Sequence, residues 1–338
     1  MNTPPHQTAR MKQARTQDFD EQASLLEGWH QHYAQLSSGS FSGAIVELLF
    51  EDINLFAEST SQALFQSGKL EDGICAVGIP LRGGAHGTFC GETLRPNTVH
   101  IFSGRDGFEF YSPSRLVMGG IVAPESAMPG WLLEKRASGE RARLKPVSPT
   151  IMREAGEFLS LVFALCREYP HLLQSENFRR QLRGGVLSCL IDVLDDGQGT
   201  DTAEETTPHK RWSIVRQARD ILRETPDASL DIEQLCRELG ISRRTLQYCF
   251  QEQVGMNPVA YLRAQRLNGV RQMLKEGQSV TDAATAWGFW HFGHFSQEYK
   301  KLFGELPSES LRRYGKPTGS DLSGRPGLLT APISTTSL

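Results

Sequence analysis

Residues 229–316 constrain the fold of this chain most strongly, because the same pattern of two short helices occurs twice within them. In the first copy, apolar residues recur at helical spacing and predict a short helix that Gly240 ends. Ser242 can cap a second helix that continues to about residue 253. Two such helices joined by a tight turn form a helix-turn-helix unit, whose second helix enters the major groove of DNA.

The second copy follows the same order. Ser279 and Asp282 have the spacing of a capping box and predict a helix that ends at Gly288. A further helix is predicted over about 291–303. Between the copies, a helix that starts at Pro258 is predicted to have a length of roughly 28 Å. Successive major grooves on one face of B-DNA lie roughly 34 Å apart, so one chain could reach two of them.

The second helix of each unit leaves polar and aromatic side chains on its outer face. Arginine can pair with guanine and glutamine with adenine, while tyrosine and lysine reach phosphates and an aromatic ring can contact a thymine methyl. The predicted contacts to double-stranded promoter DNA are Arg243, Arg244, Gln247 and Tyr248 in the first unit and His291, Phe292, Gly293, His294, Gln297 and Lys300 in the second. Trp290 is equally compatible with a core position.

Charge is distributed unevenly along the chain. Residues 209–316 contain 17 lysines and arginines against 12 aspartates and glutamates, a net charge of +5. Because the whole chain carries −3, the remainder carries −8. This asymmetry favours a basic DNA-binding domain attached to an acidic partner domain.

Several of these motifs resemble a known family. The segments SRRTLQ, YLRAQRLNGVRQML and AWGFWHFGHFSQEYKKLFGELPS are similar to the DNA-binding domain of AraC/XylS-type bacterial transcription regulators. More narrowly, GWHQHYAQLSSGSFSG and VGIPLRGG resemble the ethanolamine-utilisation regulator branch. The family resemblance implies a small-molecule effector and favours an activator, which would contact RNA polymerase. The branch implies ethanolamine with a cobalamin as candidate effectors.

Short apolar runs separated by turn residues predict strands from residue 41 to about 123. About seven such runs suggest an antiparallel barrel or jelly roll, and the family resemblance implies a cupin-like barrel. The predicted fold class is therefore α+β, with an amino-terminal antiparallel cupin-like barrel and a carboxyl-terminal all-α domain with two helix-turn-helix motifs. The candidate effector-binding residues are Arg82, Glu92, Arg105, Glu109 and Tyr111.

Helical spacing predicts a packing helix over about 22–36 and two amphipathic helices within 128–195. In relatives of this family such later helices form a homodimer contact, but the sequence equally allows them to pack on their own barrel. The predicted domains are a disordered segment 1–18, an effector-sensing and dimerisation domain 19–195, a linker 196–208, the DNA-binding domain 209–316 and a disordered tail 317–338.

Two alternatives remain at this point. A cupin-type enzyme with an accessory DNA-binding domain would need a metal site, but His86 and His100 lack the expected motif spacing, and the six cysteines show no metal-binding pattern. We expect no catalytic activity and no metal, with His86 in a loop and His100 on a strand, facing solvent or a hydrogen-bond partner. The second alternative is a regulator whose amino-terminal half binds a partner protein. No apolar run is long enough for a membrane span, so we expect a cytoplasmic protein with no membrane partner.

Overall fold

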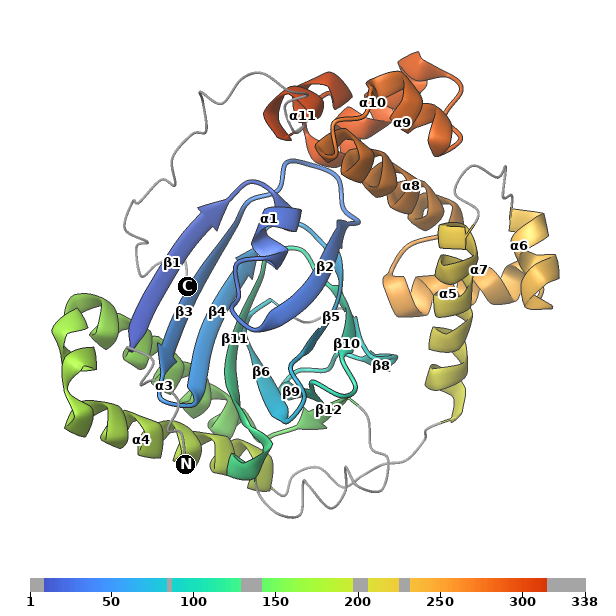
Figure 1. The fold of residues 1–338 in the computed structure, drawn as a ribbon. Coiled ribbons are helices and arrows are strands. Elements are labelled where there is room, and N and C mark those ends of the chain that lie inside the picture. Colours follow the sequence, from blue (N-terminus) through green and yellow to red (C-terminus); the bar gives the residue numbers. More distant parts are fainter. Residues whose placement is uncertain (1–8, 84–86, 129–141, 197–205, 225–231, 315–338) are drawn as a thin grey trace.

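The computed structural model describes residues 9–83, 87–128, 142–196, 206–224 and 232–314. The described chain has an amino-terminal part built on two β-sheets and a carboxyl-terminal part built of helices (Figure 1). The mixed α and β composition and the order of the two parts agree with the predicted fold class.

All strand pairings described in the two sheets are antiparallel. The seven-stranded sheet has the order β1 (Arg10–Thr16), β3 (Gly43–Phe50), β4 (Ile53–Thr60), β11 (Leu116–Pro124), β6 (Ile74–Arg82), β9 (Thr98–Ser103) and β12 (Arg143–Pro146). The five-stranded sheet has the order β2 (Trp29–Gln35), β5 (Leu64–Leu70), β10 (Phe108–Ser112), β7 (Thr88–Phe89) and β8 (Glu92–Thr93). Within the described residues, the strands form two separate sheets and do not close into one barrel.

Alternation along the strands creates two cores. Successive side chains of a strand point to opposite faces of the sheet, so Phe56 and Leu55 of β4 belong to different cores. Phe56 joins Phe102 and Phe108 in an aromatic core between the two sheets. Leu55 belongs to the core on the outer face of the seven-stranded sheet. The space between the sheets is thereby lined with rings from both of them.

Two long helices cover that outer face. α3 (Pro149–Glu168) and α4 (Glu176–Asp195) are joined by the short η2 (Pro170–Gln174), and a further short turn, η1 (Glu125–Ala127), follows β11. Figure 1 shows both helices beside the seven-stranded sheet. Leu159 of α3 and Leu190 of α4 are fully buried in the same core as Leu55. An apolar stripe of these helices therefore packs on the chain's own sheet. The sequence had allowed this arrangement as well as a homodimer contact.

The amino-terminal segment differs from its prediction in two ways. Residues expected to be disordered form β1, which pairs with β3. The helix predicted over 22–36 is wrong, because the segment forms the short α1 (Phe19–Ala23) and then β2. Gly28, with a φ of 76°, separates them. Trp29 and Tyr33 fit helical spacing, but the exposed His30 and His32 between them show the alternation of a strand.

The carboxyl-terminal part follows the predicted helix order. It consists of α5 (Thr206–Glu224), α6 (Ile232–Leu239), α7 (Arg243–Val254), α8 (Pro258–Lys275), α9 (Val280–Ala286), α10 (Phe292–Phe303) and α11 (Pro307–Tyr314). α5 starts inside the predicted linker, and α11 was not predicted. α8 connects the group α5–α7 to the group α9–α11 (Figure 1). None of the described helices has the length and apolar character needed to cross a bilayer.

Candidate nucleic-acid interface and aromatic cavity

The first helix-turn-helix unit consists of α6 and α7. Gly240 has a φ of 64° and ends α6, and the Ser242 hydroxyl caps α7 by accepting the backbone N–H of Thr245 at 3.1 Å. Leu246 and Phe250 are fully buried and fix the inner face of α7. The outer face carries the four predicted contacts of this unit, and all four side chains are exposed: Arg243, Arg244, Gln247 and Tyr248. The face thus presents guanidinium, amide and phenol groups to solvent.

The second unit consists of α9 and α10. The Ser279 hydroxyl accepts the N–H of Asp282 at 3.1 Å and caps α9. Phe295 and Tyr299 are buried on the inner face of α10. All six predicted contacts of this unit are exposed: His291, Phe292, Gly293, His294, Gln297 and Lys300. Both units therefore leave their second helix open on one face.

The aromatic start of α10 is at the surface. Trp290 is 68% exposed and Phe292 43% exposed, so the core position considered for Trp290 is wrong. Trp290 and His291 line a groove of about 370 Å³ together with Arg263 and Arg266 of α8. Cationic and aromatic groups together suit a nucleic-acid backbone and its bases.

The helical part contacts the sheets through α1. Asp18 caps α1, and its carboxylate lies 2.6 Å from the Lys275 ammonium at the end of α8. The same ammonium lies 3.0 Å from the Asp20 carboxylate. On the apolar side of α1, the Phe19 ring stacks on Phe303 of α10 at 6.1 Å between centroids. α1 thus contacts the end of α8, which precedes the second unit, and α10, which belongs to it.

A second set of contacts joins β10 to the helices. The Arg219 guanidinium of α5, which is 3% exposed, donates to the Glu109 carboxylate at 2.7 Å. The hydroxyls of Tyr111 and Tyr261 lie 3.3 Å apart in the shared core. Burial raises the pKa of Tyr111 well above its usual value, so its hydroxyl stays protonated at neutral pH. These contacts are buried and link the two parts into one apolar core.

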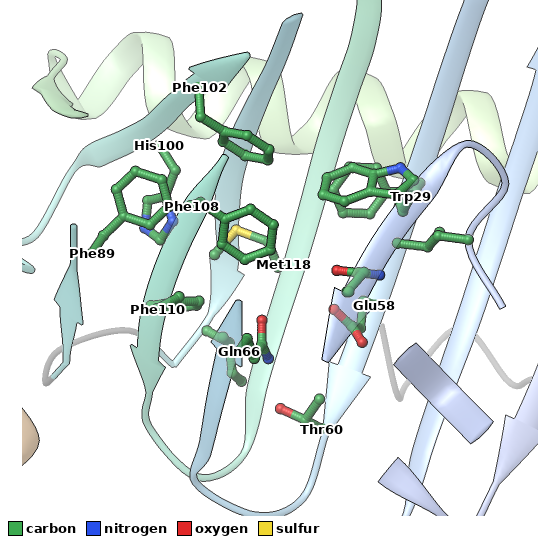
Figure 2. Close-up of a pocket in the computed structure, with 15 residues that line it drawn as sticks. Trp29, Glu58, Thr60, Gln66, Phe89, His100, Phe102, Phe108, Phe110 and Met118 are labelled. Carbon is green, nitrogen blue, oxygen red and sulfur yellow. The ribbon is translucent and has the colours of Figure 1, made fainter. Parts of the chain in front are cut away.

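A cavity lies between the two sheets. The volume that the centre of a water molecule can occupy in this cavity is about 40 Å³. Its described lining comes from both sheets and from the turn before β2: Leu26, Trp29, Gln31, Phe56, Glu58, Thr60, Gln66, Gly78, Phe89, His100, Phe102, Phe108, Phe110, Leu116 and Met118 (Figure 2). In Figure 2 the rings of Phe102 and Phe108 lie toward the top of the view, Thr60 lies at the bottom, and Glu58 lies between Trp29 and Thr60. The cavity is therefore amphipathic.

Two titratable side chains in this lining, Glu58 and His100, have pKa values that differ from their usual values. The Glu58 carboxylate accepts hydrogen bonds from Gln22 of α1 at 2.7 Å and from Tyr33 at 3.0 Å. Burial nevertheless raises the pKa of Glu58 to about 7, because neither partner is a cation. Burial lowers the pKa of His100 to about 3, so this imidazole is neutral at physiological pH.

His100 lies on strand β9, as predicted, but it does not face solvent. Its ring lies 4.5 Å from that of Phe89 and 4.9 Å from that of Phe110, between centroids. His86, the other histidine considered for a metal site, lies outside the described residues. Within the described chain, no group of three His, Cys, Asp or Glu side chains is arranged to hold a metal ion.

The five candidate effector-binding residues lie outside the described lining of this cavity: Arg82, Glu92, Arg105, Glu109 and Tyr111. Arg82 is exposed at the end of β6, and Arg105 is exposed in the turn after β9. Glu92 accepts the backbone N–H of Leu144 at 3.2 Å. Glu109 and Tyr111 contact the helical part instead.

Sequence reasoning missed Glu58, although a signal for it exists. In β4, Phe56, Glu58 and Thr60 alternate with residues of the outer core and share one face of the strand. A carboxylate in phase with an inward phenylalanine, on a strand that is otherwise mostly apolar, marks a buried charge. Such a group needs partners or a special role.

Comparison with known proteins identifies the helical part. A family model described as a helix-turn-helix domain matches residues 235–313. The chain is 28% identical over 166 residues to the XylDLEGF operon transcriptional activator 3 of Pseudomonas putida, covering 48% of this chain and 49% of that one. It is 40% identical over 103 residues to a probable thc operon regulatory protein of Rhodococcus erythropolis, covering 29% and 31%. The chain thus spans about half the length or less of these curated relatives.

A solved structure also matches part of the chain. The crystal structure of a probable AraC family transcriptional regulator from Rhodopseudomonas palustris is 34% identical, with 31% of this chain and 99% of that chain covered and a TM-score of 0.29. Residues 235–313 thus match a helix-turn-helix domain, and this chain is similar to transcription regulators of the AraC/XylS type.

Proposed function

We propose that this chain is a sequence-specific DNA-binding transcription regulator, acting as an activator, whose affinity for its promoter responds to a small molecule. The observation that carries the proposal is the pairing of buried and exposed residues in α7 and α10. Each helix buries an apolar face and leaves residues suited to base edges and phosphates exposed. Relatives named as transcriptional activators support the same function.

In this proposal α7 and α10 enter successive major grooves. α8, which connects the two units, has 18 residues and a length of roughly 27 Å at 1.5 Å per residue. That length is of the order of the roughly 34 Å repeat of B-DNA. Arg243, Arg244 and Gln247 would contact bases from α7, and His291, His294 and Gln297 from α10. Lys300 would neutralise a phosphate.

The effector would occupy the aromatic cavity between the sheets. This replaces the five polar residues predicted from sequence by the side chains that line an actual space. The proposal keeps one feature of a cupin-like barrel, which is a ligand held between two facing antiparallel sheets. The resemblance to the ethanolamine-utilisation branch suggests ethanolamine, whose size suits the cavity. A cobalamin is far too large for it.

α1 would carry the signal to the DNA-binding helices. Gln22 of α1 contacts Glu58 inside the cavity, while Asp18 of the same short helix contacts Lys275 at the end of α8. A ligand that changes the hydrogen bonding of Glu58 would therefore shift the position of α1. The other face of α1 packs on Phe303 of the second unit. This is a two-state coupling between two distinct sites.

The coupling can be tested by removing its carboxyl-terminal anchor. Lys275→Met should lower the ratio of induced to uninduced expression from the target promoter, because the variant loses the ammonium that contacts the Asp18 and Asp20 carboxylates from the end of α8. Lys69→Met, on β5 and exposed, is the matched control. Unchanged induction in Lys275→Met would assign the coupling to the stacking of Phe19 on Phe303 or to the contact of Glu109 with Arg219.

Two partners complete the proposal. As an activator the protein would contact RNA polymerase at the promoter. A homodimer would use the outer face of α3 and α4, where Leu161 is 66% exposed and Ile191 is 42% exposed. Both partners follow from the family resemblance.

The decisive experiment is genome-wide binding of the full chain in its source bacterium, followed by an electrophoretic shift assay on the most occupied promoter. We expect a discrete set of sites, and we expect Arg244→Ala to reduce binding while Arg180→Ala on the exposed face of α4 does not. Absence of any sequence-specific site, with or without cell metabolites, would refute the regulator proposal.

A further inference from the structure

The amino-terminal part of the chain, the sheet domain, caps the carboxyl-terminal end of the second recognition helix, α10. The last carbonyls of a helix have no donor inside the helix and need one from elsewhere. The backbone N–H of Gly39 donates to the carbonyls of Lys301 and Leu302, at 3.1 and 3.0 Å. The side-chain amide of Gln35, at the end of β2, donates to the same Leu302 carbonyl at 2.6 Å. A different domain therefore satisfies two terminal carbonyls of a DNA-binding helix.

Gln35 lies at the centre of this contact. Its side chain is fully buried, and the amide nitrogen also donates to the carbonyls of Ser37 at 2.8 Å and Gly39 at 2.6 Å. The two N–H bonds of one amide are thus shared among three carbonyls from both parts of the chain. Through its backbone, Gln35 exchanges two hydrogen bonds with the Asn268 side chain of α8, at 2.9 and 2.8 Å. Gln35 therefore joins the end of β2 to both α8 and α10.

The end of α10 also fits closely against the loop that follows β2. Gly304 ends α10 with a φ of 77°, in the left-handed region that favours glycine. A Cβ atom at this position would lie 2.0 Å from the Ser40 hydroxyl oxygen. The last turn of α10 therefore cannot move toward the sheet domain unless this loop moves as well.

The first recognition helix, α7, has no such contact. It also ends at a glycine in the left-handed conformation, Gly255. Within the described chain, the carbonyls of its last turn receive no hydrogen bond from the sheet domain. α7 packs instead on α5, where the Arg211 guanidinium lies 2.6 Å from the Glu252 carboxylate. The sheet domain thus holds α10 directly and reaches α7 through α5 and α8.

The cap matters for DNA reading because α10 is short and reads DNA at its other end. A recognition helix contacts base edges mainly through its amino-terminal residues. The 12 residues of α10 span roughly 18 Å, from the exposed His291 and Phe292 to the capped turn. Hydrogen bonds to bases weaken steeply when their distance or angle changes. Holding the carboxyl-terminal end therefore controls how the amino-terminal end enters the groove.

We propose that Gln35 is a positioning residue for DNA recognition, which sets the angle of α10 in its major groove through the carboxyl-terminal cap. This inference rests on the proposed function, in which α7 and α10 each read one half of the promoter site. It adds that only the half read by α10 depends directly on the sheet domain. Trp29 and Gln31, earlier along β2, line the cavity, so the strand that positions α10 also borders the proposed effector site.

The test measures how Gln35 is coupled to each half of the promoter site. The two halves are first assigned with Arg244→Ala in α7 and Gln297→Ala in α10, because each variant should relax specificity in one half. Full-length wild type and Gln35→Met are then compared in shift assays. Methionine keeps the length of the side chain and removes its donor. The DNA is the cognate site, the site with its α10 half scrambled, and the site with its α7 half scrambled.

The expected result is a loss confined to one half of the site. In wild type, scrambling either half should weaken binding at least about tenfold. Gln35→Met should bind the cognate site about tenfold more weakly, as expected for a lost hydrogen bond at a buried carbonyl. Scrambling the α10 half should then cost the variant about tenfold less than wild type, whereas scrambling the α7 half should cost both proteins the same.

Comparing the sites separates positioning from a loss of folding. A partly unfolded variant binds every site more weakly by the same factor, so the cost of scrambling either half stays unchanged. Hydroxyl-radical footprinting gives a second measurement, because Gln35→Met should lose protection over the α10 half and keep it over the α7 half. Gln13→Met, at an exposed glutamine of β1, is the matched control and should behave as wild type.

Several outcomes would overturn the inference. They are an equal loss on all three sites, a coupling of Gln35 to the α7 half, and tighter binding by Gln35→Met, which would mean that the cap restrains α10. Wild-type behaviour of Gln35→Met on every site would also refute it, while the proposed function would stand. If wild type itself shows no preference for the cognate site, the proposed function is wrong.

Discussion

The helical domain and the sheet domain differ in how their candidate functional residues are brought together. In α7 the proposed DNA contacts lie within one helix and next to each other on one face. In the cavity, Trp29, Glu58 and Phe108 come from three strands that are far apart in the sequence. A recognition face is therefore a property of local periodicity, whereas a cavity is a property of strand pairing.

The two domains are nevertheless joined by a common core. Tyr111 of β10 and Tyr261 of α8 belong to the same buried cluster as Phe250 of α7. A locally encoded DNA-binding domain is thus packed against a sheet that only long-range pairing can form. The following changes test how independent the two domains are.

The largest effect is expected from Phe250→Ala. The ring is fully buried, and its loss should reduce the free energy of unfolding by about 3–5 kcal/mol. Trp290→Ala, at a side chain that is 68% exposed, should change it by less than about 0.5 kcal/mol. Urea unfolding followed by circular dichroism measures both. We expect one transition for the whole chain, and two separate transitions would show that the shared core does not couple the domains.

The next effect concerns the pH dependence of stability through Glu58. Its pKa is about 7 in the folded state and 4.5 in the reference state, so the folded state keeps a proton that the unfolded state releases. The resulting stabilisation is fully present below pH 4.5 and falls by about 3 kcal/mol as pH rises to about 7. Glu58→Gln removes this loss, so its unfolding free energy relative to wild type should rise across that range and stay level above it.

His100 acts in the opposite direction and provides a control. Its pKa is lowered from 6.5 to about 3, so the stability linked to this group is present above pH 6.5 and is lost as pH falls. Because His100 contributes equally to both proteins, the difference in unfolding free energy between Glu58→Gln and wild type reports on Glu58 alone. Urea titrations at about pH 5 and about pH 8 suffice, and a difference independent of pH would show that Glu58 has an ordinary pKa.

A smaller effect is expected for Arg244→Ala. If this guanidinium reads a base, the variant should lose about 1–3 kcal/mol of binding free energy on the cognate site and relax specificity at one base pair. Competitive shift assays with single-base variants of the site measure this. An equal loss on every sequence would assign Arg244 to a phosphate, and Arg180→Ala should have no effect.

The smallest effect is expected for Lys300→Ala. A single phosphate contact contributes about 0.9 to the slope of log affinity against log salt concentration. The variant should lose about that much of the slope on all sequences alike, whereas Lys69→Ala on β5 should keep it. A change of base preference in Lys300→Ala would instead place this lysine at a base edge.

By itself the sequence determined the helical domain in detail. Gly240, Ser242 and Pro258 mark helix ends through backbone preferences and capping that act within a few residues. Spacing alone then separates buried from exposed side chains. Local signals failed where they were ambiguous, as in the segment of Trp29 and Tyr33, which fits the period of a helix and lies in β2.

Only the tertiary structure decided the cavity and its link to the helices. The alternation of Phe56 and Glu58 along β4 indicates that Glu58 is buried, but only the pairing of the strands decides which side chains face it. The contact of Asp18 with Lys275 joins residues that are 257 positions apart in the sequence. Such groupings depend on which strands pair and in which register, and therefore on the free energy of the whole fold.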